Sequence, residues 1–127
     1  MGPTASPFIL KDAAFAPLQG PEGSPDAWLV FDTRVAEALD GIREGDEVLV
    51  FTWLDRARRD VLRVHPRGDP ANPEQGVFNT RSPDRPNPIG LHRVEVVSVE
   101  GTRLRVRNLE AVDGTPIVDV KPVLNGY

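Results

Sequence analysis

The segment GLHRVEVVSVEGTRLRVRNLEAVDG, residues 90–114, contains two runs in which apolar and polar side chains alternate. Alternation with a period of two is typical of strands that bury one face. The runs meet at Glu100-Gly101, a pair that favours a tight hairpin turn. Three arginines share the outward face of the second run: Arg103, Arg105 and Arg107. The segment therefore predicts an antiparallel hairpin in a fold built on strands.

Four further segments read as strands. AWLVFD (27–32) and TPIVDVKPV (115–123) are short apolar runs, and GDEVLVFTWL (45–54) is apolar on both faces, which predicts a buried strand. In DVLRVHPRG (60–68) the apolar face is predicted to hold Leu62, Val64 and Pro66. The opposite face would then hold three basic side chains, those of Arg63, His65 and Arg67.

One short helix is expected near residues 33–41, because Val35, Leu39 and Ile42 recur at helical spacing after a capping Asp32 or Thr33. In residues 1–26 the apolar residues recur with no regular spacing, and this segment is expected to form a loop or extended arm. The 13 prolines and 11 glycines suit short strands and tight turns. We predict one domain over residues 1–127, a mostly-β barrel, closed or partly closed, with one short helix and no parallel βαβ unit.

The composition narrows the functional classes. With 39% apolar and 27% charged residues, the chain has the composition of a soluble globular protein. No apolar run approaches the roughly 20 residues of a membrane span, and the N-terminus lacks the features of a signal peptide, so a cytoplasmic location is expected. The absence of cysteine excludes disulfides and thiolate metal sites, and two histidines argue against a zinc site.

The charges are unevenly distributed. The net charge is −4, but residues 56–107 carry 11 basic and 6 acidic residues (11 − 6 = +5), which leaves 4 − 13 = −9 for the remainder. A basic half on an acidic protein can form a local anion-binding face. The alternative is a solvated surface of mixed charge.

The motif GVFNTRSPDRPNPIGL (76–91) combines rigidity with polarity. Each X-Pro step holds the residue before it extended, and the three prolines provide no N–H donor. Arg81 and Arg85 each offer a forked set of donors suited to carboxylate or phosphate. Gly90 allows a turn or the close approach of a ligand. The motif predicts a preorganised polar wall, and the alternative is a stiff loop whose arginines pair with neighbouring acids.

The order of several motifs resembles that of the TrmO (TsaA-like) family of S-adenosylmethionine-dependent tRNA adenosine methyltransferases, whose core is a β-barrel. The likeness covers nearly the whole chain, in the segments SPF (6–8), PLQG (17–20), VLVF (48–51), GVFNTRSPDRPNPIGL (76–91), VEG (99–101) and LEAVDGTPIVDVKP (109–122). Known members methylate the exocyclic amine of threonylcarbamoyl-adenosine beside the anticodon of certain tRNAs. The resemblance thus implies S-adenosylmethionine as cofactor, tRNA as partner and, with the small size, a homodimer with the cofactor near the interface.

The resemblance also implies a set of cofactor contacts at matching motif positions: Pro17, Leu18, Gln19, Thr52, Trp53, Arg81, Leu91, Asp113, Gly114, Thr115 and Pro116. Leu18 departs from the family, which usually has arginine there, and longer members add a C-terminal domain. Asp113 can accept hydrogen bonds from a ribose hydroxyl or an ammonium group. Leu91 and Trp53 can pack against adenine, although each is by default a core residue.

The methyl acceptor is less defined. Asn87, or the carbonyls of RPNP, can orient the acceptor amine, and no residue stands out as a general base. The substrate-binding candidates are Arg63, His65, Arg67 and Arg85, and the first three would form one basic surface with the arginines of the second hairpin strand. Two other functions remain open: a methyltransferase that acts on a small molecule, and a non-catalytic module that binds S-adenosylmethionine or RNA.

Overall fold

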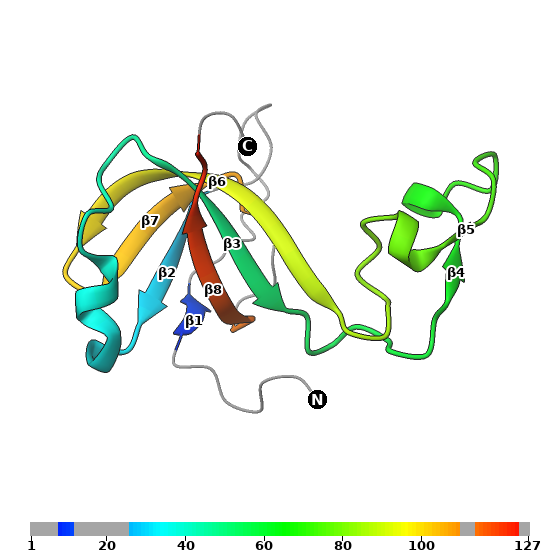
Figure 1. Cartoon of the computed structure of the whole chain (residues 1–127), viewed down its shortest axis with the longest axis horizontal. Helices are drawn as coiled ribbons and strands as arrows, with labels where there is room; N and C mark the ends of the chain where they lie inside the picture. Colours follow the sequence, from blue (N-terminus) through cyan, green and yellow to red (C-terminus); the bar gives the residue numbers. More distant parts are fainter. Residues whose placement is uncertain (1–7, 12–25, 110–113, 125–127) are drawn as a thin grey trace.

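The computed structural model describes residues 8–11, 26–109 and 114–124, and its centre is a closed six-stranded barrel (Figure 1). All neighbouring strands are antiparallel, in the order β1-β2-β7-β6-β3-β8. The strands are β1 (Phe8–Lys11), β2 (Ala27–Phe31), β3 (Glu47–Trp53), β6 (Ile89–Glu100), β7 (Arg103–Arg107) and β8 (Pro116–Pro122). The predicted mostly-β barrel is confirmed.

The expected hairpin is formed by β6 and β7. Glu100 pairs with Arg103, so Gly101 and Thr102 make the turn, and Gly101 has a positive φ of 62°. That conformation costs glycine little, which explains the residue at this position. β2, β3 and β8 lie where strands were expected. β1 was not expected, because residues 1–26 were read as loop or extended arm.

The core fills the barrel with one face of each strand. β2, β3 and β7 alternate between buried and more accessible residues, so β3 buries Val48, Val50 and Thr52 but leaves Leu49 and Phe51 partly accessible. The prediction that β3 is buried on both faces is therefore wrong. The buried apolar cluster consists of Ala27, Leu29, Phe31, Val48, Val50, Val94, Val96, Leu104, Val106, Leu109 and Ile117. Each large aliphatic side chain buried in this way contributes about 1.5–3 kcal/mol.

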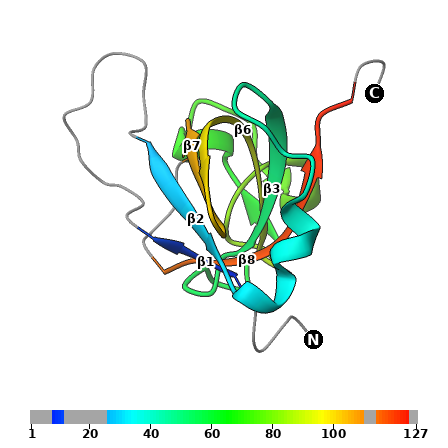
Figure 2. The same ribbon diagram turned by 90° about the vertical axis from the view of Figure 1, so that its left-hand side faces the viewer.

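The predicted helix is a 3-10 helix, η1 (Thr33–Leu39). Asp32 caps it, since its carboxylate accepts a hydrogen bond from the Arg34 N–H at 2.8 Å. Val35 and Leu39 pack against the core cluster from outside. Figure 2 views the molecule from the η1 side and shows the helix following the end of β2.

Residues 54–88, between β3 and β6, leave the barrel and form a projection that we call the arm (Figure 1, right). The arm has its own two-stranded sheet, in which β4 (Arg63–Val64) pairs with β5 (Gln75–Gly76). It also contains two 3-10 turns, η2 (Pro66–Gly68) and η3 (Val77–Asn79).

The arm corrects the prediction of a strand over 60–68. Only Arg63 and Val64 are extended in a ladder, because Pro66 begins η2 and Arg67 has a positive φ of 62°. The side chains of Arg63, His65 and Arg67 therefore do not share a strand face. β4 pairs with β5 and not with a strand of the barrel, so no shared sheet places these residues beside the arginines of β7.

Candidate functional site

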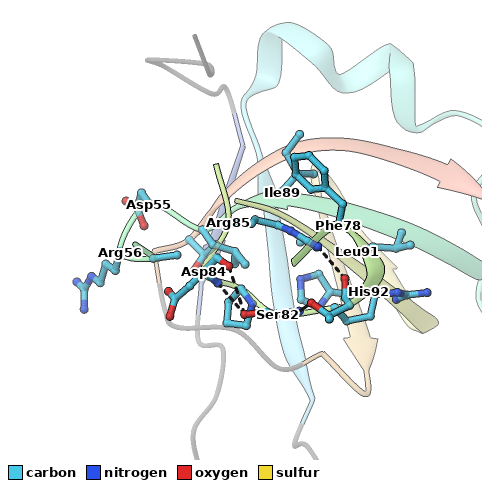
Figure 3. A pocket seen from close by; sticks show the side chains of 16 residues that line it. Asp55, Arg56, Phe78, Ser82, Asp84, Arg85, Ile89, Leu91 and His92 are labelled. Carbon is cyan, nitrogen blue, oxygen red and sulfur yellow. Dashed lines mark hydrogen bonds between the residues drawn. The ribbon is translucent and has the colours of Figure 1, made fainter. Parts of the chain in front are cut away.

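A pocket of about 820 Å³ lies where the arm leaves the barrel (Figure 3). We call it the barrel–arm pocket. Its lining comes from three parts of the chain: Leu54, Asp55, Arg56 and Ala57; Phe78, Thr80, Arg81, Ser82, Pro83, Asp84, Arg85, Ile89, Gly90, Leu91 and His92; and Thr115. The motif at 76–91 thus forms most of the pocket, as a polar wall.

Backbone pairing holds the two ends of the arm together. The Leu54 N–H donates to the Pro88 carbonyl at 2.8 Å, and the Arg85 N–H donates to the Arg58 carbonyl at 3.0 Å. The Arg58 N–H donates to the Asp84 carboxylate at 2.8 Å. These bonds compensate for the donors that the prolines lack, so the wall is tied to the segment that follows β3.

Arg85 holds the wall in shape from inside. Its Nη2 donates to the carbonyls of Val77 and Thr80, the latter at 2.7 Å. The Thr80 hydroxyl donates to the same Val77 carbonyl at 2.8 Å and accepts from the Ser82 N–H at 3.1 Å. Arg85 lines the pocket, but its Nη2 is used in the hydrogen bonds that hold η3 against the wall.

Arg59 anchors the proline-rich segment, although nothing in its local pattern beyond its charge predicts that role. Its guanidinium donates to the Pro86 carbonyl at 2.6 Å and to Asn87 Oδ1 at 2.8 Å, and it lies 5.3 Å from the centroid of the Trp53 ring. Trp53 and Asn87 are absent from the pocket lining. The carbonyl oxygen of the Asn87 side chain is engaged by Arg59, which leaves its amide group to donate.

Thr52 and His92 form a polar pair at the floor of the pocket. Thr52 is fully buried, and its Oγ1 lies 3.0 Å from His92 Nε2. A Cβ on Gly90 would lie 2.4 Å from that Oγ1 and 3.0 Å from that Nε2, so only glycine fits between them. His92 lines the pocket, whereas Thr52 does not. His92 was missed because a lone histidine in a strand carries no motif.

The structure brings together part of the expected cofactor set. Arg81, Leu91 and Thr115 line the barrel–arm pocket, and Gly114 and Pro116 flank Thr115 in the chain. Thr52 and Trp53 do not line the pocket, and Pro17, Leu18, Gln19 and Asp113 lie outside the described residues. Arg63, His65 and Arg67 lie elsewhere on the arm. Phe78 and Arg56 line the pocket although neither was singled out in the sequence.

The charges around the pocket are partly unneutralised. Arg56 and Arg81 have no ion pair within the described ranges, and both are exposed. Ile89, Phe78 and Leu91 group on one side in Figure 3, and Asp55 and Arg56 lie on the other. The pocket therefore offers an apolar surface beside charges of both signs.

The described part of the chain contains no group of three or more His, Cys, Asp or Glu side chains that could hold a metal ion. None of its helices is long and apolar enough to cross a membrane.

Comparison with known proteins identifies the relatives of the chain. An S-adenosyl-L-methionine-binding protein of Archaeoglobus fulgidus is 44% identical over 121 residues, which are 95% of this chain and 84% of the relative. A probable S-adenosyl-L-methionine-binding protein of Methanothermobacter thermautotrophicus is 43% identical over 122 residues, which are 96% of this chain and 85% of that protein.

Solved structures agree with these relatives. The crystal structure of TrmO from Pseudomonas aeruginosa superposes with a TM-score of 0.68 at 26% identity, covering 98% of this chain and 55% of that one. The chain therefore spans about half the length of the solved structure that it matches. The sequence model of the tRNA-methyltransferase O N-terminal domain matches residues 5–127. The chain belongs to the family of the tRNA-methyltransferase O N-terminal domain.

Proposed function

We propose that the chain binds S-adenosylmethionine in the barrel–arm pocket and transfers its methyl group to the exocyclic amine of threonylcarbamoyl-adenosine next to the anticodon of tRNA. One observation carries the proposal. The pocket collects Arg81 and Leu91 from the motif at 76–91 and Thr115 from a distant segment, and all three are positions at which the family resemblance implies cofactor contacts. The names of the two archaeal relatives support the choice of cofactor.

The pocket suits this cofactor in size and chemistry. Its volume of about 820 Å³ falls within the roughly 300–1,000 Å³ of small-molecule sites. Leu91 and Ile89 offer an apolar surface to the adenine ring. The guanidinium of Arg81 is suited to the methionyl carboxylate, and the carboxylate of Asp55 to the ammonium group.

The residues of the chain have a limited chemical task. When bound, S-adenosylmethionine supplies a methyl group that its sulfonium already activates. The protein then has to align the acceptor amine with that methyl group and exclude water. The bonds from Arg85 and Arg59 keep the wall in one shape, which is the preorganisation that alignment requires. The carbonyl of Pro86, one of the candidates for orienting the amine, already accepts from Arg59 and does not line the pocket.

A methyl-transfer assay tests the proposal. Labelled S-adenosylmethionine is incubated with the chain and with bulk tRNA that carries or lacks the threonylcarbamoyl group. We expect label in the modified tRNA and none in the unmodified tRNA. Transfer to neither tRNA, by protein shown to bind the cofactor, would contradict the proposed reaction.

A second candidate function is a module that binds S-adenosylmethionine without transferring its methyl group. It is favoured by the names of the archaeal relatives, which describe binding and no reaction. Calorimetry separates the candidates: saturable cofactor binding without transfer to tRNA or to small amines indicates the binding module. Transfer to a small amine alone indicates a small-molecule methyltransferase.

We also propose a homodimer that covers the edge of the barrel–arm pocket. The arm and the adjoining end of β6 expose large apolar side chains, with Phe78 at 82% and Leu62 at 66% exposure. Phe78 borders the pocket, so a second copy seated there would shield the cofactor from water. Light scattering at micromolar concentration should give twice the mass of one chain, and the mass of a single chain would contradict the dimer.

A further inference from the structure

A second hollow of about 720 Å³ lies on the arm, between η2 and the wall of the barrel–arm pocket. Its lining residues are Val64, His65, Pro66, Arg67, Gly68, Asn79, Thr80, Arg81, Ser82, Pro83 and Asp84. The stretch Thr80–Asp84 lines both cavities. A ligand in one cavity is therefore separated from a ligand in the other by this stretch alone.

The second hollow holds two arginines that no acid neutralises. Arg67 and Arg81 have no ion pair among the residues with a described placement. Asp84 is the one acid in the lining, and its Oδ1 already accepts a hydrogen bond from the Arg58 N–H at 2.8 Å. The hollow thus has a surplus of positive charge.

The arginines of the barrel strands are arranged differently, because each one has a carboxylate partner. Arg93 pairs with Glu47 at 2.8 Å, and Arg105 pairs with Asp26 at 3.1 Å. Arg103 and Arg107 pair with Glu100 and Glu95, each at 3.4 Å. The basic stripe on β7 is therefore largely neutralised, and an anionic partner finds unpaired guanidinium groups on the arm instead.

The turn that carries Arg67 is held in place by its own hydrogen bonds. Arg67 has a φ of 62°, a conformation that residues with a Cβ rarely adopt. The Gly68 N–H donates to the His65 carbonyl at 2.8 Å, and His65 Nδ1 donates to the Asn72 carbonyl at 2.9 Å. The Asn72 side chain donates to the Pro66 carbonyl at 2.9 Å. These bonds hold the backbone of the turn at Arg67 in place, while its side chain is exposed.

We propose that this second hollow binds a backbone phosphate of the RNA, next to the nucleotide whose base enters the barrel–arm pocket. The inference rests on the proposed tRNA methyltransferase function. Forked guanidinium groups bind phosphate oxygens with two parallel hydrogen bonds, which matches Arg67. Arg81 lines both cavities, so its charge favours an anion in either one, whereas Arg67 lines the second hollow alone.

The salt dependence of tRNA binding tests the proposal. Affinity is measured at several salt concentrations for the wild type, for Arg67→Gln and for Arg67→Lys. Arg43→Gln is the matched control, because Arg43 is also exposed, has no ion pair in the described ranges and lies between η1 and β3, away from the arm.

We expect Arg67→Gln to weaken tRNA binding about tenfold at low salt and to reduce the slope of log affinity against log salt by about 0.7, the value for one single-stranded phosphate contact. Arg67→Lys should keep the slope because it keeps the charge. Arg43→Gln should change neither quantity, and cofactor affinity should be equal in all variants.

Each outcome bears on one claim. An Arg67→Gln variant that binds tRNA like Arg43→Gln would overturn the phosphate site and leave the proposed function intact. A wild type that neither binds nor methylates tRNA would overturn the proposed function and the inference together. Binding of adenosine monophosphate that depends on Arg67, with no such dependence for tRNA, would assign the hollow to a small phosphate ligand and overturn the RNA assignment.

Discussion

Gly90 shows how a single residue fixes the floor of the barrel–arm pocket. In Gly90→Ala the new Cβ would lie 2.4 Å from Thr52 Oγ1, which is fully buried and cannot move aside freely. We expect a loss of about 1–3 kcal/mol in the free energy of unfolding, as for other overpacked sites. Denaturant unfolding of the wild type and of Gly90→Ala measures this loss.

Two variants check this reading of Gly90. Gly76→Ala is the control, since the nearest atom to its added Cβ is 4.0 Å away. This substitution should change the free energy of unfolding little. Adding Thr52→Ala to Gly90→Ala removes the clashing oxygen, so the two changes together should destabilise by less than the sum of their separate effects. Strict additivity would show that the clash does not cause the loss.

Two arginines of the pocket show which feature of the site could not be predicted from the sequence. Arg81 and Arg85 occupy similar places in a proline-rich motif, and both were expected to offer forked donors to a carboxylate or phosphate, or to pair with neighbouring acids. Arg85 instead reaches back to the Val77 and Thr80 carbonyls, while Arg81 keeps no ion pair within the described part. The difference depends on how η3 folds against the wall. No local pattern encodes that contact, just as none marked Arg59 or His92.

Among the elements, β3 and β6 are linked by an ion pair whose strength depends on pH. Arg93 donates to Glu47 at 2.8 Å, and this hydrogen bond holds the pKa of Glu47 below its ordinary value of 4.5. A carboxyl with a lowered pKa in the folded state stabilises the fold above its ordinary pKa. That contribution is lost as the pH falls through the lowered value.

Glu47→Gln should therefore reduce the free energy of unfolding at neutral pH by a small amount, and the difference from the wild type should shrink as the pH falls below about 4.5. Unfolding at a series of pH values measures it. Glu44→Gln is the control, because Glu44 is exposed and forms no ion pair with the residues described. A Glu47→Gln effect that is constant with pH, or equal to that of Glu44→Gln, would contradict the assignment.

The elements that could be predicted are those whose own sequence carries the signal. β6 and β7 alternate and share a Gly turn, and η1 has both a cap and helical spacing. β1 has only four residues, and one of its partners, β8, comes from the far end of the chain, so closure of the barrel supplies what its sequence lacks. In residues 60–68 the alternation is coincidental, because Pro66 starts a turn that ends the strand.

At the scale of the whole molecule, the barrel and the arm differ in whether their arginines are paired with acids. Each arginine of β6 and β7 is neutralised by a nearby acid, whereas Arg56, Arg67 and Arg81 of the arm have no ion pair in the described part. The excess of +5 over residues 56–107 was visible in the sequence, but not which arginines account for it. Only the fold assigns partners, since those of Arg93 and Arg105 lie 46 and 79 residues away.

The central claim is that the barrel–arm pocket binds S-adenosylmethionine, and two positions on β6 allow a matched test. Leu91 and Val99 are 39% and 40% exposed on the same strand, but only Leu91 lines the pocket. Calorimetric titration of S-adenosylmethionine into Leu91→Ala should show a loss of about 1–2 kcal/mol in binding free energy, from the apolar contact removed. Val99→Ala should bind like the wild type. Equal affinities for Leu91→Ala and Val99→Ala, or no binding by the wild type, would contradict the account.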